Sequence, residues 1–301
     1  MNVRLDANRL AILRELADRE TIAATASALS MTPSAVSQQL KVLTREAGVA
    51  LLEPDGRRLR LTDAGHALVV RAEDVLAALD RAAAEMELYR GSLRGRVRVA
   101  MFPSGAALLA PAVLTAMASS GVVVEVGDED LPSSAVPRLL ADYDVVLTHR
   151  DDRAPAIGSD RVASRVLLRE PIDLVLTPTH RLAGQSSVSL SELADENWLS
   201  VRGGFPVDDV LQSVATVTGV QPRVVQRLND FKVIEALVAS GLGVALIPRL
   251  AVGNSHLVVL PLTGVRAGRV YELATRPYAD QRPAVAAVLA AFESAAAPFR
   301  T

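Results

Sequence analysis

Polar and cationic side chains recur three or four residues apart in the segment that follows Pro33. A helix over this segment would place them on one face. Hydroxyl, amide and cationic groups are the ones that pair with base edges and phosphates in the major groove of DNA. A solvated surface helix can have the same composition, so the neighbouring segments decide between the two interpretations. The set consists of Ser34, Ser37, Gln38, Lys41 and Arg45.

The start of this segment favours a helix. The hydroxyl of Thr32 can cap a helix N-terminus, and Pro33 suits the first helical position, where a backbone N–H is not needed. We include Thr32 and Pro33 among the candidate DNA-binding residues. An apolar stripe lies opposite the polar set and would face a core. The stripe consists of Val36, Leu40, Leu43 and Ala47.

The flanking segments favour the DNA-binding interpretation. Upstream, a short amphipathic helix is predicted around Ile22, Ala26 and Leu29, and residues 30–32 leave a tight connection, which is helix-turn-helix spacing. Downstream, residues 49–52 and 57–61 are predicted as two short strands joined by a turn at residues 54–56. Such a hairpin is a wing, and it would bring cations to the phosphate backbone. These cations are Arg57, Arg58 and Arg60.

The composition excludes several other chemistries. The chain has 301 residues and no cysteine, which excludes disulfides, thiolate metal sites and cysteine nucleophiles. Its four histidines lack ligand spacing, and we find no nucleophile motif or phosphate-binding glycine loop. The net charge of −2 gives no general attraction to nucleic acid or to an anionic membrane, although residues 1–62 carry nine Lys and Arg against seven Asp and Glu. We predict no enzyme activity, no metal site and no cofactor.

No targeting or membrane segment is predicted. The N-terminal residues mix charged with apolar side chains, which breaks up a signal-peptide core. No apolar run approaches the ~20 residues that a membrane helix needs. We therefore expect a cytoplasmic protein with no membrane partner.

A second predicted helix, over residues 63–90, carries an extended apolar pattern. Thr62 can cap this helix, and Asp63 is favourable in its first turn. Apolar or small residues alternate in steps of four and three over four heptads, which is typical of a coiled coil. We expect this helix to pair two chains; the alternative is an amphipathic helix that lies on its own domain. Residues 91–95 would follow it as a hinge. The seam consists of Leu61, Gly65, Leu68, Ala72, Val75, Leu79, Ala82, Met86 and Tyr89.

From residue 96 onward, short β runs alternate with helices, which predicts an α/β architecture with largely parallel sheets. Strands are predicted at residues 97–102, 122–126, 144–148, 172–177, 199–201, 223–228, 243–247, 256–260 and 269–275. Helices are predicted at residues 108–117, 136–141, 190–194, 206–217, 230–240 and 282–297.

Several motifs in these segments are similar to those of LysR-type transcriptional regulators, and the resemblance covers the whole chain. They include residues 33–40, the junction Leu61-Thr62-Asp63-Ala64-Gly65, Gly95-Arg96-Val97-Arg98-Val99, His180-Arg181-Leu182-Ala183 and residues 241–248. Two places depart from the family pattern. Leu51-Leu52-Glu53-Pro54 replaces Leu-Phe-x-Arg, which loses a cation that often meets phosphate, and Thr44 stands where a glutamate is common.

The resemblance implies an α+β multidomain fold. A winged helix-turn-helix DNA-binding domain would cover residues 1–62, a linker and dimerisation helix residues 63–90, and an effector-binding domain residues 91–301. The last domain would be similar to a periplasmic binding protein, with subdomain I at about residues 96–168 and 269–301 and subdomain II at about residues 169–268. The implied function is transcription regulation. A dimer, and further a tetramer built as a dimer of dimers, would bind an operator of dyad-symmetric double-stranded DNA and respond to a small-molecule effector between the subdomains.

The expected effector site follows from a general rule. In α/β sheets, ligands bind beyond the C-terminal ends of strands, often at helix N-termini. The resulting candidates are Ser104, Thr148, Arg202 and Asn229. Ser104 matches a position where the family commonly places a hydroxyl against the effector, and a plain helix cap is an equal alternative for it. For Asn229 a helix cap is favoured over a ligand contact. Arg202 favours an anionic effector and residues 128–130, all acidic, favour a cationic one, so the sequence leaves both signs open.

Two other functions remain consistent with the sequence. One is a small-molecule-binding protein or an enzyme built on the α/β part, with the N-terminal region serving only for dimerisation. The other is a constitutive DNA-binding protein whose cleft is vestigial. A test of DNA binding separates the first from our main interpretation, and a test of ligand binding separates the second.

Overall fold

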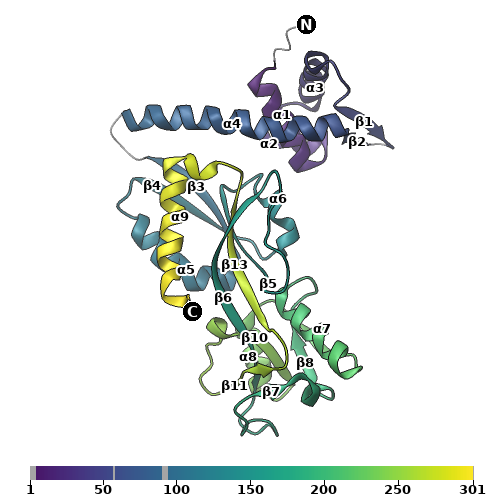
Figure 1. Cartoon of the computed structure of the whole chain (residues 1–301), viewed down its shortest axis with the longest axis vertical. Helices are drawn as coiled ribbons and strands as arrows, with labels where there is room; N and C mark the ends of the chain where they lie inside the picture. Colours follow the sequence, from purple (N-terminus) through teal and green to yellow (C-terminus); the bar gives the residue numbers. More distant parts are fainter. Residues whose placement is uncertain (1–4, 57, 90–93, 301) are drawn as a thin grey trace.

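The computed structural model describes residues 5–56, 58–89 and 94–300. Figure 1 shows a small helical unit with a β-hairpin, and an elongated α/β part with two lobes. A long helix, α4 (Asp63–Tyr89), runs between the helical unit and the α/β part. We describe the three parts in chain order.

The N-terminal unit consists of α1 (Ala7–Arg19), α2 (Ile22–Ala28), α3 (Pro33–Ala47), β1 (Leu52–Asp55) and β2 (Arg58–Leu61). A side chain caps each helix: those of Asp6, Thr21 and Thr32 accept hydrogen bonds from backbone N–H groups of the first turn. Gly48, at φ 71°, ends α3 in the left-handed conformation. The predicted helix-turn-helix is therefore confirmed. Its core contains Leu10, Leu13, Leu16, Val36, Leu40, Leu43 and Leu51.

The wing begins later than the sequence predicted. Instead of a strand at residues 49–52 and a turn at 54–56, β1 extends to Asp55 and places Pro54 opposite Leu59 of β2. Both strands of a two-stranded sheet are edge strands, and a proline fits an edge because it has no N–H to pair. Leu51 is 2% exposed and anchors the chain ahead of the strand.

The apolar seam of helix α4 (Asp63–Tyr89) is buried along its first half and exposed along its second half. In the first half, Leu68 and Ala72 pack into the core of the N-terminal unit. Gly65 is required there, because a Cβ would lie 2.2 Å from the carbonyl oxygen of Leu51. In the second half, Val75, Leu79, Met86 and Tyr89 are 43, 50, 52 and 80% exposed. Packing on the chain's own domain thus accounts for the first half, and an exposed apolar stripe remains beyond it.

The predicted hinge at residues 91–95 falls mostly outside the described residues, because residues 90–93 are not among them. The chain is described again from Arg94, and β3 begins at Gly95.

The α/β part is built on one nine-stranded sheet in the order β4-β3-β5-β13-β6-β10-β8-β9, with β11 beside β6. Its strands are β3 (Gly95–Met101), β4 (Val122–Asp128), β5 (Val145–Asp151), β6 (Ala163–Leu176), β8 (Asn197–Ser200), β9 (Arg223–Arg227), β10 (Val244–Pro248), β11 (Val258–Leu260) and β13 (Gly268–Thr275). A separate pair is formed by β7 (Val188–Ser189) and β12 (Leu262–Thr263). The helices are α5 (Pro103–Met117), α6 (Val136–Leu139), α7 (Pro206–Thr218), α8 (Phe231–Ala239) and α9 (Pro283–Ala296).

This sheet is mixed rather than largely parallel, which corrects the prediction. The pairs β3/β4, β3/β5, β8/β9 and β8/β10 are parallel. In contrast, β13 runs antiparallel to β5 and β6, and β10 and β11 run antiparallel to β6. The reason is that β6 and β13 cross between the lobes in opposite directions. The first half of β6 was missed because its polar Ser164, Arg165 and Arg169 hide the strand pattern.

Two hydrophobic cores lie on either side of this crossing, and Figure 1 shows β6 and β13 running between them. We name the two sides lobe I and lobe II. The core of lobe I contains Val97, Leu109, Leu147, Leu273 and Phe292. The core of lobe II contains Leu174, Trp198, Leu211, Ile234 and Leu246. Among the described residues, we find no helix with the length and apolar character needed to span a membrane.

Candidate functional site

The polar face of α3 lies on the surface of the N-terminal unit. Ser34, Gln38, Lys41 and Arg45 are exposed and Ser37 is half-buried, while the apolar stripe on the opposite face is buried. Within the described residues, no hydrogen bond or ion pair involves the side chain of Gln38, Lys41 or Arg45. An amide and two cations are thus presented to solvent with their bonding groups available.

Contacts at both ends of α3 hold this face in position. At the N-terminus, Thr32 Oγ1 accepts from the N–H of Ala35 at 3.2 Å and shares a 3.0 Å hydrogen bond with Ser34 Oγ. Toward the C-terminus, Arg9 of α1 donates to the Glu46 carboxylate at 2.6 and 3.0 Å. The hydroxyl of Thr32 is therefore committed to the helix cap, next to Pro33.

The wing lies beside α3 with one described arginine side chain. Arg60 pairs with Glu53 across the hairpin at 2.6 Å, and the two side chains are 64 and 42% exposed. Because an ion pair this exposed contributes little, the guanidinium can exchange Glu53 for phosphate. Arg58 opens β2, and Arg57 lies outside the described residues.

Three of the four expected effector residues meet between the lobes. Ser104 lies in the first turn of α5 in lobe I, whereas Arg202 and Asn229 follow β8 and β9 of lobe II. The cavity next to them has a volume of about 20 Å³, which is room for one water. Its walls are mostly apolar and include the rings of Phe102, Phe205 and Phe231.

Thr148 does not line this cavity, although it was expected to. It is 4% exposed within β5, where side chains alternate between the two faces of the sheet. His149 therefore lies on the cavity side and lines it, opposite Tyr271 in the strand register. In β5 it is therefore the side chain of His149, and not that of Thr148, that reaches the cavity.

A buried ion pair lies in the cleft. The side chains of Arg269 and Glu170 are 1 and 0% exposed, and Nε lies 2.7 Å from Oε2. Arg269 Nη2 also donates to Tyr271 Oη at 2.6 Å and to Ser104 Oγ at 3.1 Å. Tyr271 in turn donates to Glu170 at 2.9 Å, and burial raises the pKa of its hydroxyl. The two charges cancel, so this part of the cleft is polar but neutral overall.

His149 completes the cleft as an uncharged base. Its ring centroid lies 4.2 Å from that of Phe102 and 6.1 Å from that of Phe205. Burial, and then the positive charge of Arg269, hold the pKa of His149 well below its ordinary value. Its Nδ1 is buried and has no partner among the described residues.

An ion pair closes the mouth of the cleft. Asp130, which follows β4 in lobe I, lies 2.9 Å from Arg202 Nη2 and 2.6 Å from Asn229 Nδ2, both of lobe II. The guanidinium of Arg202 also lies over the ring of Phe205, 5.7 Å from its centroid. The lobes are therefore held together at the mouth by one carboxylate.

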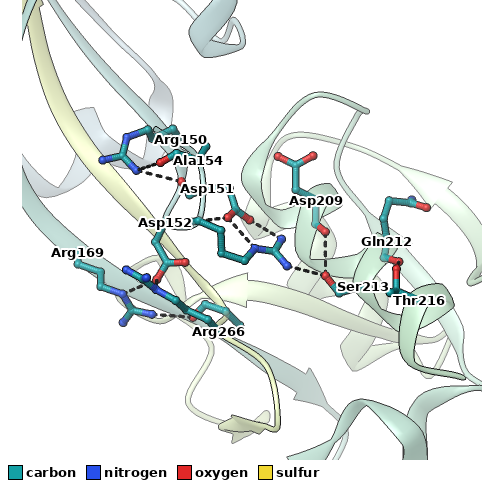
Figure 2. Close-up of polar contacts among 12 residues, drawn as sticks. Arg150, Asp151, Asp152, Ala154, Arg169, Asp209, Gln212, Ser213, Thr216 and Arg266 are labelled. Atoms are coloured by element: carbon teal, nitrogen blue, oxygen red, sulfur yellow. Dashed lines mark hydrogen bonds and ion pairs between the residues drawn. The ribbon is translucent and has the colours of Figure 1, made fainter. Parts of the chain in front are cut away.

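A second cluster ties the crossing strands together (Figure 2). Asp152, directly after β5, accepts from Arg169 Nε at 2.5 Å and from Arg266 Nε at 3.1 Å. Beside it, Asp151 pairs with Arg153 at 2.7 Å, and Arg153 donates to Ser213 of α7 at 2.8 Å. These contacts connect the end of β5 in lobe I with both interlobe connections and with lobe II.

The sequence did not point to Arg269, Glu170 or Tyr271. A signal was present, because Arg269 and Tyr271 alternate on one predicted strand and so share a face. Glu170 is 99 residues away from Arg269 in the chain, and nothing local indicates that they meet.

One chain thus carries a polar helix face beside a wing and, separately, a cleft between two lobes. Together they define a class of protein: a DNA-binding regulator with a separate ligand-binding part. The family model for the bacterial regulatory helix-turn-helix protein, lysR family, matches residues 7–66. The model for the LysR substrate binding domain matches residues 90–297, more than half of the chain. The chain belongs to the LysR family, and it is a LysR-type transcriptional regulator.

Curated relatives agree with this assignment, and solved structures share the fold. The transcriptional dual regulator GltC of Bacillus subtilis (strain 168) is 28% identical over 248 residues, 81% of either chain. The HTH-type transcriptional regulator CbbR of Rhodospirillum rubrum is 25% identical over 274 residues, 89% of either chain. A full-length OxyR variant from Pseudomonas aeruginosa has a TM-score of 0.66 at 19% identity, covering 96% of this chain and 98% of that one. Full-length CbnR complexed with target DNA has a TM-score of 0.53 at 20% identity, covering 97 and 100%. These structural likenesses show the fold.

Proposed function

We propose that α3 and the wing bind one half of a DNA operator and that an effector in the cleft alters this binding. The observation that carries the proposal is the open polar face of α3, on which the side chains of Gln38, Lys41 and Arg45 have no partner among the described residues. A surface helix stabilised by its own ion pairs would not leave this set free. The face also has the groups that base edges and phosphates require.

The proposed roles follow from side-chain chemistry. Gln38 is placed to pair with the N6/N7 edge of adenine, and Ser34 and Ser37 with either kind of base. Lys41 would take guanine or phosphate. Thr32 and Pro33 would stand next to the DNA at the N-terminus of α3. The wing arginines Arg57, Arg58 and Arg60 would contact phosphates and so set the register of the unit on the duplex.

We further propose the division of the chain into residues 1–62, 63–90 and 91–301, with subdomain I at about residues 96–168 and 269–301 and subdomain II at about residues 169–268. The exposed second half of α4 supports pairing of two chains, which would present two α3 helices to an operator with dyad symmetry. Tetramers would form from such dimers. Because the proposed target is chromosomal DNA, we place the protein in the cytoplasm.

We infer no catalytic activity. Arg269, Glu170 and Tyr271 are hydrogen-bonded to one another, and Ser104 bonds to Arg269 rather than to a general base. A nucleophile would need such a base within hydrogen-bond reach.

Footprinting of the DNA upstream of the protein's own gene tests the proposal, with and without an extract of small molecules. We expect a protected dyad whose footprint shortens or shifts when the extract is added. Absence of protection down to low ionic strength would assign the function to the α/β part alone, since phosphate contacts are strongest at low salt.

The role of Gln38 is tested by Gln38→Ala. Loss of a bidentate base contact should cost about 1–3 kcal/mol on the operator and relax base preference at one position. Binding titrations on operator and random duplexes at one salt concentration measure this. Gln212→Ala is the matched control, because it removes an exposed glutamine from a helix of lobe II. Equal weakening on both duplexes would contradict base readout by Gln38.

A further inference from the structure

The mouth of the cleft is built to receive a carboxylate. Arg202 Nη2 and Asn229 Nδ2 converge on the same oxygen, Asp130 Oδ2, at 2.9 and 2.6 Å. The amide of Asn229 is oriented by its own Oδ1, which accepts from the backbone N–H of Arg202 at 2.9 Å. Lobe II therefore presents two N–H donors to this one oxygen.

The carboxylate that fills this position comes from the opposite lobe. Asp130 follows β4 of lobe I, and its side chain is 27% exposed, so it has an open path into solvent. While it bridges the lobes, the cavity behind it is about 20 Å³, too small for a ligand larger than water. A ligand carboxylate can bond to both Arg202 Nη2 and Asn229 Nδ2 only if Asp130 separates from them.

The charges around the cavity favour an anion over a cation. A cation would have to take the place of Arg202 at Asp130, where it would face the N–H donors of Asn229 and the nearby guanidinium groups. An anion would take the place of Asp130 and leave both donors satisfied. Deeper in the cleft, Arg269 is balanced by Glu170 and His149 is uncharged. The site thus accommodates one negative charge, at the mouth.

The walls indicate the shape of the rest of the ligand. The rings of Phe102, Phe205 and Phe231 line the cavity, and that of His149 lies against Phe102. Aromatic walls of this kind fit a flat apolar body. The Ser104 side chain also lines the cavity, and its hydroxyl can bond to a small polar group.

We propose that the effector is a small, flat monocarboxylate and that Asp130 acts as a built-in competitor that occupies the place of its carboxylate in the closed cleft. This inference rests on the proposed effector-dependent function and names its ligand class. Binding would move Asp130 off Arg202 and Asn229, replacing an interlobe contact with contacts to the ligand. The distance between the lobes at the mouth then depends on whether Arg202 and Asn229 bind the carboxylate of Asp130 or that of the ligand.

The test uses three probes of one shape and three charges: benzoate, benzamide and benzamidinium. Binding to the full chain is measured by calorimetry at one pH and ionic strength. We expect benzoate to bind and the other two to bind at least tenfold more weakly.

Asp130→Asn keeps the shape of the competitor but removes its charge. It should tighten benzoate binding about three- to tenfold, because less of the protein is held in the closed state. Arg202→Gln should abolish the preference for benzoate over benzamide.

Asp280→Asn is the matched control, since Asp280 belongs to another partly exposed ion pair, with Arg165, and lies outside the cleft. It should leave the benzoate affinity unchanged. The proposal would be overturned in favour of a cationic effector if benzamidinium bound more tightly than benzoate and if Asp130→Asn lost the binding of benzamidinium. Equal binding of all three probes, or no binding of benzoate to either the original chain or Asp130→Asn, would overturn it as well.

Footprinting of the same proteins separates this inference from the proposed function. If the operator is protected but benzoate fails these tests, the ligand class is wrong and the regulator assignment stands. If benzoate binds as expected and no DNA is protected, the proposed function fails instead.

Discussion

His149 is a titratable side chain held in its neutral form at the cleft. It is 7% exposed, lies against Phe102, and has the guanidinium of Arg269 as the neighbouring charge that lowers its pKa. Its folded-state pKa lies below the ordinary value of about 6.5 that applies to an unfolded chain. Below that pH the unfolded state binds one proton more than the folded state, so stability falls as pH falls.

We predict that His149→Phe reduces the acid sensitivity of the folded chain. Below pH 6 the native histidine should cost up to about 1.4 kcal/mol of unfolding free energy per pH unit, and the variant should lack this contribution. Urea unfolding at pH 7, 6 and 5 measures it as the difference between the two proteins. His256→Gln, which removes an exposed imidazole, is the control variant. Identical pH profiles for His149→Phe and the original chain would show that His149 is not held neutral.

At the scale of elements, α4 combines two functions in one apolar pattern. Its first half closes the core of the N-terminal unit through Leu68 and Ala72. Its second half presents Val75, Leu79 and Met86 to solvent, each at least 43% exposed. A second copy of the same helix can bury this stripe, and burial of each leucine-sized side chain would contribute about 1.5–3 kcal/mol.

We predict that Leu79→Asp weakens self-association by at least about 100-fold, because a symmetric dimer loses the contribution of two leucines and gains two charges at the seam. Sedimentation equilibrium measures the dissociation constant. Ala67→Asp adds the same charge to an exposed alanine of α4 that lies away from the seam, and it should change the dissociation constant little. Equal effects from the two variants would place the dimer contact elsewhere.

At the scale of the whole molecule, an ion-pair cluster joins the N-terminal unit to lobe I, which lies beside α1 and α4 in Figure 1. Asp18 of α1 and Glu73 of α4 have side chains that are 2 and 4% exposed, and both pair with Arg276. Arg161 of lobe I also pairs with Asp18, at 2.5 Å. Burial alone would lower the pKa of Arg276, but Asp18 and Glu73 raise it above its ordinary value, so the guanidinium remains charged. The DNA-binding unit is thus fastened to the ligand-binding part of its own chain.

We predict that Arg276→Gln loosens this contact by about 3 kcal/mol, because it leaves two buried carboxylates short of a partner. Amide hydrogen exchange in α1 should show roughly 100-fold lower protection. The matched control is Arg165→Gln, which removes an arginine whose side chain is 41% exposed and whose pairs with Asp280 and Glu293 are similarly exposed. Unchanged protection of α1 in Arg276→Gln would mean that the cluster does not hold the unit in place.

Features that depend on neighbours in the chain could be read before the structure was known. The cap at Thr32, the polar and apolar faces of α3 and the extent of α4 all follow from residues within one or two helical turns of one another. The same holds for the alternation of strands and helices in the α/β part. For this reason the class of fold and the polar face that we propose for DNA binding could be predicted from residue order alone.

The ligand site depended on contacts between distant segments. Asp130 meets Asn229 across 99 residues, and Arg269 meets Glu170 across another 99. The sequence left open whether the acids at residues 128–130 or Arg202 sets the charge of the effector. The contacts of Asp130 with Arg202 and Asn229 of the other lobe provided the argument for an anion. Arg269 and Glu170 meet because β13 pairs with β6, and Asp130 and Asn229 meet between the segments that follow β4 and β9. No local pattern encodes either contact. Folding in three dimensions therefore decided the cleft, the uncharged state of His149 and the attachment of the DNA-binding unit to lobe I.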